Sequence, residues 1–343
     1  MQTAKLTRIP MTQSREIRLK ARPNGLPTAD NFELASVDLA APGAGEVQVR
    51  NHWMTVDPYM RGRMNDVKSY TPPFQLGQTM EGGAVGQVTA SNDPSLKVGD
   101  MVQSNFGWRE AFNAPGSAVQ KLPSQNLPPQ TYLGAAGMPG LTAYAGLLRV
   151  AALKEGDVVF VSGAAGAVGS MVAQIAKAKG NTVIGSAGGP EKVAFLKSLG
   201  VDHVIDYKAQ KDLNAALAAA APDGIDVYFD NVGGDHLEAA LTAARPFARF
   251  ALCGAISMYN ATELPAGPRN LMMMVGKQMR MEGFIVTTHW DMMAQFHSDL
   301  AGWVREGKVT WKETVHEGIA SAPEAFLGLF KGENLGKMLV KLA

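Results

Sequence analysis

Short apolar stretches between turns fill the first part of the chain, which is typical of a β-rich fold. In 46–50 (EVQVR), polar and apolar residues alternate, as expected for a strand with one buried face. Residues 77–88 are rich in glycine and suit tight connections or bulges between strands. Residues 98–102 predict a turn that leads into another strand, and the proline-rich segment 123–129 ends this region.

From residue 157 the pattern changes to strands that alternate with helices. Short β-branched or apolar runs predict the strands, and apolar residues at helical spacing predict the helices. The strands are expected at 157–161, 181–184, 203–205, 225–229 and 249–252, and the helices at 168–179, 190–199, 211–220 and 236–244. Strands separated by helices of this length predict parallel crossover units in a doubly wound sheet.

The end of the chain returns to strand-like and turn-like sequence. We therefore expect an α/β protein made of three parts. A β-rich domain covers 1–130, a doubly wound domain covers 131–305, and the segment 306–343 returns to the first domain.

Composition and charge narrow the class of protein. Lys plus Arg number 32 against 31 Asp plus Glu, and the net charge of +1 argues against a nucleic-acid or acidic-membrane partner. The one cysteine, Cys253, excludes an intrachain disulfide. The uncharged stretches 122–148 and 158–176 are interrupted by proline, glycine and polar residues, whereas a membrane helix needs about 20 mainly apolar ones. We expect a cytoplasmic protein with a small-molecule ligand.

The most informative segment is 158–169 (VVFVSGAAGAVG), which lies between an expected strand and an expected helix. Small residues there let the pyrophosphate of a dinucleotide approach backbone N–H groups at the positive end of the helix. Against the pattern G-x-G-x-x-G the segment gives A-x-G-x-x-G, with Ala164 in place of the first glycine. The alternative is a plain tight turn whose glycines serve packing.

The next strand bears on the choice of cofactor. An NAD site usually has Asp or Glu at the end of the second strand, but 184–189 (IGSAGG) has no carboxylate. Lys192 follows in the next helix, and Tyr207 ends the third strand. A missing acid and a nearby cation suit the 2′-phosphate of NADPH. The alternative for Lys192 is a solvated helix lysine.

Metal and hydrolase chemistry find little support. Of the 6 histidines, only His289 and His297 lie close together in sequence, and catalytic zinc usually takes three protein ligands. No serine lies in a G-x-S-x-G motif, which would mark a nucleophile of hydrolases.

Further segments spread over the chain carry a family resemblance. They are 56–64 (VDPYMRGRM), 137–144 (GMPGLTAY), 228–234 (YFDNVGG), 253–260 (CGAISMYN), 283–286 (GFIV) and 331–337 (KGENLGK). With the glycine-rich segment, they resemble the zinc-independent branch of the medium-chain dehydrogenase/reductase superfamily. The most similar group is the NADPH-dependent alkenal double-bond reductases, which includes the leukotriene B4 dehydrogenase/prostaglandin reductases. Residues 22–25 (RPNG) and 260–265 (NATELP) look most like the bacterial curcumin-reductase type.

The resemblance implies a GroES-like β-rich catalytic domain and a Rossmann doubly wound parallel-sheet domain, with NADPH and substrate in the cleft between them. It also implies a homodimer. Gly166, Ala167, Val168 and Gly169 would meet the pyrophosphate, and Lys192 and Tyr207 would bind the 2′-phosphate. The other implied cofactor contacts are Asn231, Cys253, Gly254, Ala255, Ile256, Ser257, Phe284, Ile285, Val286 and Asn334.

Several of these contacts have alternatives in ordinary structure. Asn231 precedes two glycines and suits a turn, the segment 284–286 would be core strand in any α/β protein, and Asn334 could end a helix. Cys253 follows an apolar run, so we interpret it as a small packed hydrophobe and not as a nucleophile.

The implied reaction is hydride transfer from NADPH to the β-carbon of an α,β-unsaturated ketone or aldehyde. Negative charge then develops on the carbonyl oxygen, where removal of one hydrogen-bond donor typically costs about 10²–10³ in rate. Tyr259 matches the family tyrosine beside the substrate carbonyl, and Tyr59 matches a second tyrosine of the pocket. A phenol stays protonated at pH 7 and can donate. The alternatives are packing tyrosines and a donor hydroxyl on the cofactor ribose.

Two further groups of side chains have open roles. Met272, Met273, Met274, Met279 and Met281 could form a soft pocket wall, or equally a methionine-rich core or dimer face. Arg61 and Arg63 could attract a carboxylate-bearing substrate, although solvated salt bridges are the favoured interpretation.

The hypothesis is therefore an NADPH-dependent, metal-free 2-alkenal/enone reductase with a broad apolar substrate range. The alternative enzyme is an NADPH-dependent quinone oxidoreductase, which would share the cofactor loop. A non-catalytic NADPH-binding sensor is the alternative from another class. A zinc alcohol dehydrogenase is disfavoured by the lack of ligands.

Overall fold

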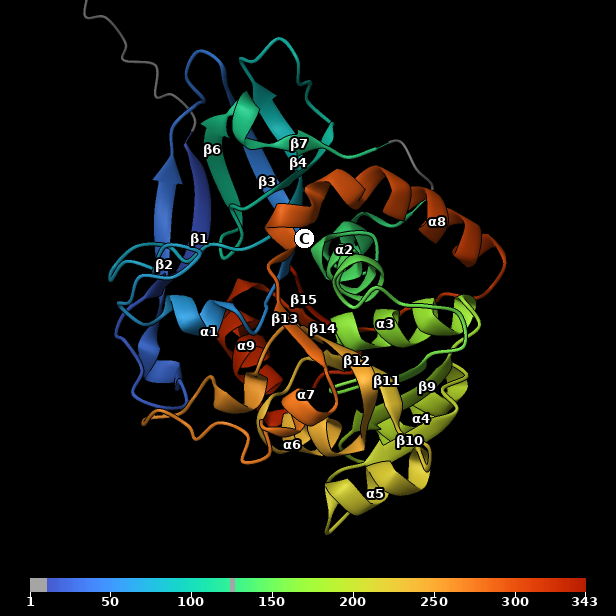
Figure 1. Cartoon of the computed structure of the whole chain (residues 1–343). Helices are drawn as coiled ribbons and strands as arrows, with labels where there is room; N and C mark the ends of the chain where they lie inside the picture. Colours follow the sequence, from blue (N-terminus) through green and yellow to red (C-terminus); the bar gives the residue numbers. More distant parts are fainter. Residues whose placement is uncertain (1–10, 124–126) are drawn as a thin grey trace, which may run out of the picture.

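The computed structural model of the chain describes residues 11–123 and 127–343 (Figure 1). Residues 1–10 of the expected first domain, and 124–126 of the proline-rich segment, lie outside the described residues. In Figure 1 the β-rich part lies at the upper left and the parallel sheet at the lower right. Within the described part, no helix is long and apolar enough to cross a membrane.

The β-rich part contains a seven-stranded sheet with a two-stranded sheet beside it. The small sheet pairs β1 (Thr12–Leu19) with β2 (Phe32–Leu39). The seven-stranded sheet has the order β14-β15-β3-β4-β5-β7, and β6 also pairs with β3. Its bounds here are β3 (Glu46–Thr55), β4 (Ala84–Ser91), β5 (Met101–Ser104), β6 (Ala111–Pro115) and β7 (Gln120–Lys121). These strands follow the short apolar stretches of the sequence.

The last residues of the chain complete this sheet. β14 (Glu313–Glu317) pairs with β15 (Lys337–Lys341), and β15 pairs antiparallel with β3. Between them lies a helix, α9 (Ala322–Lys331), where the sequence analysis expected only strands and turns. That expectation was wrong because it overlooked buried apolar residues at helical spacing, namely Ala322, Ala325, Phe326 and Leu329.

The second part is a six-stranded parallel sheet with the order β10-β9-β8-β11-β12-β13. The predicted alternation is confirmed. Its strands are β8 (Val158–Val161), β9 (Thr182–Ala187), β10 (His203–Asp206), β11 (Ile225–Asp230), β12 (Ala244–Leu252) and β13 (Arg280–Gly283). Its connecting helices are α3 (Ala167–Ala178), α4 (Pro190–Ser198), α5 (Leu213–Ala220) and α6 (Gly234–Ala243). The order reverses between β8 and β11, where open α/β sheets bind ligands.

Several helices escaped the sequence analysis. Besides α9, the longest are α8 (Met293–Arg305) and α2 (Met138–Ala145). Residues 139–145 of α2 are all buried, so this helix has no polar face that would reveal its period. The shorter ones are α1 (Met60–Arg63), α7 (Met273–Gly276), the 3-10 helices Ala29–Asn31, Gly116–Ala118, Pro129–Leu133, Ile256–Met258, Val286–Met292 and Ile319–Ser321, and the π-helix Gly146–Val150.

Candidate active site

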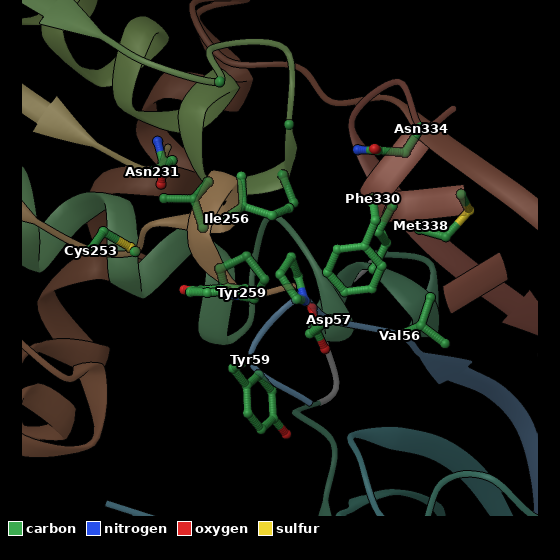
Figure 2. A pocket seen from close by; sticks show the side chains of 18 of the residues that line it. Val56, Asp57, Tyr59, Asn231, Cys253, Ile256, Tyr259, Phe330, Asn334 and Met338 are labelled. Carbon is green, nitrogen blue, oxygen red and sulfur yellow. The ribbon is translucent and has the colours of Figure 1, made fainter. Parts of the chain in front are cut away.

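A cavity of about 1520 Å³ lies where the β-rich part meets the carboxyl ends of β8, β11 and β12 (Figure 2). Its walls come from the α1 region, the glycine-rich loop, the loop after β12 and the connection from α9 to β15. Pockets for a single drug-sized ligand typically measure about 300–1,000 Å³. This cavity has room for a dinucleotide together with a second small molecule.

The glycine-rich loop leads from β8 directly into α3. Gly163 has a φ of +59°, and Gly166 precedes the helix without any side-chain cap. A Cβ on Gly169 would lie 2.4 Å from the carbonyl oxygen of Gly163, so only glycine allows α3 to start this close to the loop. Residues 166–169 line the cavity, and the N–H groups of a first helical turn, which lack intrahelical partners, make an anion site. The loop therefore fits a pyrophosphate.

Two lysine side chains make the cavity wall positively charged near α4 and the end of β10. Lys192 of α4 lines it half-buried, beside Tyr207 and Lys208. Burial lowers the pKa of Lys192, and the Lys208 ammonium lowers it further, against an opposing effect of Glu191. Among residues 11–123 and 127–343, no carboxylate forms an ion pair with Lys192. Two ammonium groups without a direct anionic partner suit a phosphate.

Asp206, the carboxylate at the end of β10, accepts backbone hydrogen bonds from the turns that follow β9 and β10. Its Oδ1 accepts from the N–H of Gly189 at 3.0 Å and from that of Lys208 at 3.1 Å. The second strand, β9, ends at Ala187 as the sequence predicts, without an acid. This end of the cavity thus presents cations where an NAD site would present a ribose-binding carboxylate.

Buried Asp230 organises the end of β11. Its Oδ1 accepts hydrogen bonds from the hydroxyls of Ser162 (3.1 Å) and Tyr228 (2.7 Å). The N–H groups of Val232 (2.9 Å) and Gly233 (2.8 Å) donate to the same oxygen. Four donors on one carboxylate oxygen fix the turn that follows the strand.

Asn231 is held in this turn through its backbone N–H and its amide nitrogen. Its Nδ2 donates to the carbonyl oxygen of Ser162 at 2.8 Å, and its N–H donates to the Ser162 hydroxyl at 2.9 Å. Asn231 lines the cavity, and its Oδ1 accepts no hydrogen bond from the described residues, so it can accept one from a ligand. The turn and ligand interpretations of Asn231 are therefore compatible.

The loop after β12 is fixed by backbone hydrogen bonds to the same turn. The N–H groups of Cys253 and Gly254 donate to the carbonyl oxygen of Asp230 at 2.9 and 3.0 Å. Those of Ile256 and Ser257 donate to Asn231 and Val232 at 3.2 Å each. This loop carries Tyr259, which ends the short 3-10 helix Ile256–Met258.

Tyr259 is placed as a hydrogen-bond donor. Its hydroxyl oxygen accepts from the N–H of Ala255 at 3.3 Å, which leaves its own proton for another acceptor. A Cβ on Gly254 would lie 2.8 Å from this hydroxyl, so the glycine makes room for it. Burial raises the pKa of Tyr259, which keeps the phenol protonated well above neutral pH.

Tyr59 lies on the β-rich side of the same cavity, as Figure 2 shows. Burial raises its pKa strongly, and the Asp57 carboxylate adds to this effect. Asp57 is itself buried and pairs with Lys337, whose Nζ lies 3.0 Å from Oδ1, while Thr55 donates to Oδ2 at 2.8 Å. This buried pair ties the turn before Tyr59 to β15.

Cys253 is half-buried in the cavity wall and packs as the sequence analysis expected. It packs against the core of the parallel sheet, and burial raises the pKa of its thiol to about 12, with a further contribution from Asp230. Since the thiolate is the nucleophile, a thiol with this pKa is unreactive at neutral pH.

The structure brings together nearly all of the side chains and loops that the sequence analysis selected. Lining this cavity are Tyr59, Gly166, Ala167, Val168, Gly169, Lys192, Tyr207, Asn231, Cys253, Gly254, Ile256, Ser257, Tyr259, Phe284, Ile285, Val286 and Asn334. Ala255 is the exception, because it lines a neighbouring cavity of about 1050 Å³ instead. Presence in the wall locates these residues, and their roles stay predictions.

Sequence reasoning missed other residues of the wall. Tyr70, Arg109, Lys208, Phe330 and Lys337 all line the cavity. Lys208 follows Tyr207 directly and Lys337 ends a recognised segment, so proximity in sequence could have suggested these two. No sequence pattern marked Tyr70, Arg109 or Phe330.

The structure shows where the selected methionines and the two arginines, Arg61 and Arg63, lie. The selected methionines do not line the main cavity, and Met274, Met279 and Met281 pack against a core cluster of the parallel sheet. Arg63 pairs with Glu81 at 2.8 Å, as the salt-bridge interpretation holds. Arg61 departs from it, because its side chain is buried and takes part in no ion pair within the described residues.

Across 11–123 and 127–343, no group of three or more His, Cys, Asp or Glu side chains is placed to hold a metal ion. His289 and His297 have other partners: His289 contacts Arg149 through Nδ1, and Nε2 of His297 lies 2.8 Å from the carbonyl oxygen of Ala136.

Two family models match the chain. Residues 15–122 match the family described as N-terminal domain of oxidoreductase, and residues 167–301 match the family described as zinc-binding dehydrogenase. The matched ranges correspond to the β-rich part and to most of the parallel-sheet part.

Individual proteins are similar over nearly the whole chain. The NADPH-dependent curcumin reductase of Escherichia coli is 41% identical over 331 residues, which cover 95% of this chain and 96% of that protein. The NADP(+)-dependent 2-alkenal reductase of Nicotiana tabacum is 40% identical over 336 residues, covering 96% and 98%. The crystal structure of CurA from Vibrio vulnificus in complex with NADPH superposes with a TM-score of 0.91 at 44% identity, covering 96% and 99%.

Proposed function

Since this chain belongs to the medium-chain dehydrogenase/reductase family, in the group of the curcumin and 2-alkenal reductases, we propose that it uses NADPH to reduce the C=C bond of α,β-unsaturated ketones and aldehydes. The observation that carries this proposal is a protonated, donor-competent tyrosine, Tyr259, in one cavity with an anion-binding glycine-rich loop and a cluster of lysines.

The chain's own residues fit the cofactor. The start of α3 at Gly166 to Gly169 would hold the pyrophosphate, and Lys192 with Tyr207 would hold the 2′-phosphate. Asn231 and Asn334 would make further contacts to the cofactor, and 284–286 would contact the nicotinamide. When bound, NADPH supplies a hydride to the β-carbon of the substrate. Half-buried Cys253 and Ile256 form part of the wall that would shield the reacting atoms from water.

Tyr259 acts on the substrate carbonyl. As the β-carbon gains hydride, negative charge moves to the carbonyl oxygen, and the phenol proton is donated there as a hydrogen bond. Such a donor lowers the barrier because it is already oriented before charge develops. Its orientation follows from the Ala255 N–H, which fixes the hydroxyl oxygen, and from the space that Gly254 leaves. Tyr59 would provide the second polar contact from the opposite wall.

The test measures NADPH oxidation with an aliphatic enone and a simple quinone side by side, with NADH as the paired control. We expect rapid turnover of the enone with the saturated ketone as product, and slow turnover with NADH. Turnover of the quinone alone would make the chain a quinone oxidoreductase. NADPH binding without either reaction would indicate the sensor.

The same assay tests the proposal that the reaction needs no metal. Activity should survive prolonged treatment with a strong chelator. Loss of activity that added zinc restores would contradict a metal-free reaction.

We also propose that the chain forms a homodimer and works in the cytoplasm. Support for the dimer comes from exposed apolar side chains next to the outer strand β13, with Met272 76% and Val275 70% exposed. Sedimentation equilibrium should give twice the chain mass of 36.4 kDa, and a monomer at micromolar concentration would contradict this. Fractionation of the source cells addresses the location.

A further inference from the structure

Arg61 holds a position that the proposed chemistry does not use. It lies in α1 and is only 2% exposed. Its guanidinium donates three hydrogen bonds: Nε to Oδ1 of Asn260 at 3.0 Å, one terminal nitrogen to Oδ1 of Asn65 at 2.7 Å, and the other to the carbonyl oxygen of Gly25 at 2.8 Å. All three acceptors are neutral.

Among the residues that the structure describes, the guanidinium is therefore a buried cation without an anionic partner. Nearby arginines do have carboxylate partners, since Arg63 pairs with Glu81 and Arg22 with Asp66. Burial lowers the pKa of Arg61, which reflects the free-energy cost of removing the charge from water. Because Arg61 stays buried at this cost and makes three directed hydrogen bonds, we infer that it holds the three acceptor segments in fixed positions.

The acceptors belong to three segments that are distant in sequence. Gly25 lies between β1 and β2, Asn65 follows α1, and Asn260 is the residue after Tyr259. A Cβ on Gly25 would lie 3.3 Å from Cγ2 of Thr262, so the loop around Tyr259 rests closely on the β-rich part. Arg61 thus joins the Tyr259 loop to the helix that follows Tyr59.

Tyr259 lies between two anchors. On the side before it, backbone hydrogen bonds attach 253–257 to the turn after β11. On the side after it, Arg61 binds Asn260, whereas 261–267 are exposed. Without Arg61, the loop would be attached firmly on one side only.

We propose that Arg61 is a positioning residue for Tyr259, acting through Asn260 to hold the phenol in place against the β-rich wall of the cavity. This inference rests on the proposed function, in which Tyr259 donates to the substrate carbonyl. Only arginine offers a planar fork that reaches three acceptors in different directions, so lysine should replace it poorly.

The kinetic test is a double-mutant cycle of Arg61→Met with Tyr259→Phe. Arg61→Met alone should lower kcat for an enone about 10-fold, a fraction of the loss typical for a removed donor, with the Kd of NADPH within about twofold. In the Tyr259→Phe background, Arg61→Met should change kcat less than about twofold, because it acts through the same hydroxyl. Asn260→Ala should reproduce Arg61→Met in milder form.

Arg15→Met is the matched control. Arg15 forms an ion pair with Glu110 at 2.6 Å with its side chain 50% exposed, and it does not line the cavity. It should leave kcat unchanged. If Arg61→Met fails to fold, Arg61→Lys and Asn260→Ala are each combined with Tyr259→Phe in the same double-mutant cycle.

A second readout does not depend on activity. Hydrogen exchange of the free protein should become at least about 10-fold faster at the amides of Tyr259 and Ala261 in Arg61→Met, and stay unchanged in α3. These amides now donate to Ile256 and Met258. Unchanged exchange there, or kinetic effects that simply multiply in the cycle, would overturn the assignment. Absence of enone turnover in the wild type would refute only the proposed function. The hydrogen-exchange measurement would still test whether Arg61 holds the Tyr259 loop in place.

Discussion

At the scale of single residues, the site depends on side chains whose surroundings determine their protonation. Tyr259 and Tyr59 are half-buried in the cavity wall, and loss of water around each phenol raises its pKa, so both stay donors. Lys192 faces Lys208 with no direct carboxylate partner among the residues that the structure describes, so it suits an added anion. The environment of each side chain, more than its residue type, thus distinguishes the hydrogen-bond donors from the phosphate-binding lysine.

Tyr259→Phe removes the hydroxyl and keeps the ring. We expect kcat for an enone to fall about 10²-fold, as for other removed donors at a developing oxyanion, with NADPH affinity nearly unchanged. Steady-state kinetics and fluorescence titration of NADPH measure the two quantities. Because the pKa of Tyr259 is raised, kcat of the wild type should show no loss of a donor between pH 7 and about pH 10.

The matched control for this variant is Tyr144→Phe. The Tyr144 hydroxyl donates to Asp299 at 2.6 Å outside the cavity, so kcat should be retained. Wild-type turnover by Tyr259→Phe would remove this residue from the chemistry.

Lys192→Ala should raise the KM for NADPH at least about 10-fold and change the KM for NADH little, because only NADPH carries the 2′-phosphate that the ammonium attracts. Lys197→Ala, an exposed lysine of the same helix α4, is the control and should have no effect. Equal effects of Lys192→Ala on both cofactors would reject the phosphate assignment.

At the scale of elements, the glycine-rich loop and α3 work as one unit. Gly163 turns the chain after β8, and Gly169 lets the first turn of α3 lie against that turn. The isolated bridge between Gly166 and Gly336 adds the C-terminal connection to the same unit, with the N–H of Gly336 donating to Ala165 at 2.8 Å. The anion site is therefore built from backbone, whose position the glycines permit.

Gly169→Ala should push the start of α3 away from the loop, since its Cβ would lie 2.4 Å from the Gly163 carbonyl oxygen. We expect the Kd of NADPH to rise about 10-fold or more, and the free energy of unfolding to fall by about 1–3 kcal/mol, as for overpacked sites. Gly302→Ala in α8, where a Cβ meets no atom within 4 Å, is the control. Unaltered NADPH binding in Gly169→Ala would show that the close approach is not required.

Elements were predictable where their pattern was local. The alternation of β8 to β12 with α3 to α6 followed from short apolar runs in the strands and from helical spacing of apolar residues in the helices. α2 is buried almost all round and gave no such pattern, and α9 was overlooked although its spacing was present. β13 is short, largely exposed and charged, so neither alternation nor an apolar run revealed it.

At the scale of the whole molecule, the cavity is assembled from segments far apart in sequence. Motifs in the sequence located most of its wall, yet they could not show which segments bind one another. The buried pair of Asp57 and Lys337 and the hydrogen bonds of Arg61 join parts of the chain that are 280 and 199 residues apart, taking the differences of the residue numbers. Such contacts depend on tertiary packing, which local patterns do not encode.

In the proposed reaction, hydride reaches the β-carbon of an enone while the carbonyl is only polarised. The most direct test incubates the protein with an aliphatic enone and NADPH carrying deuterium at the transferable position, and locates the label by NMR. We expect a saturated ketone with deuterium at the β-carbon and a solvent proton at the α-carbon. Deuterium on a carbinol carbon, in an allylic alcohol with the C=C bond intact, would contradict the account.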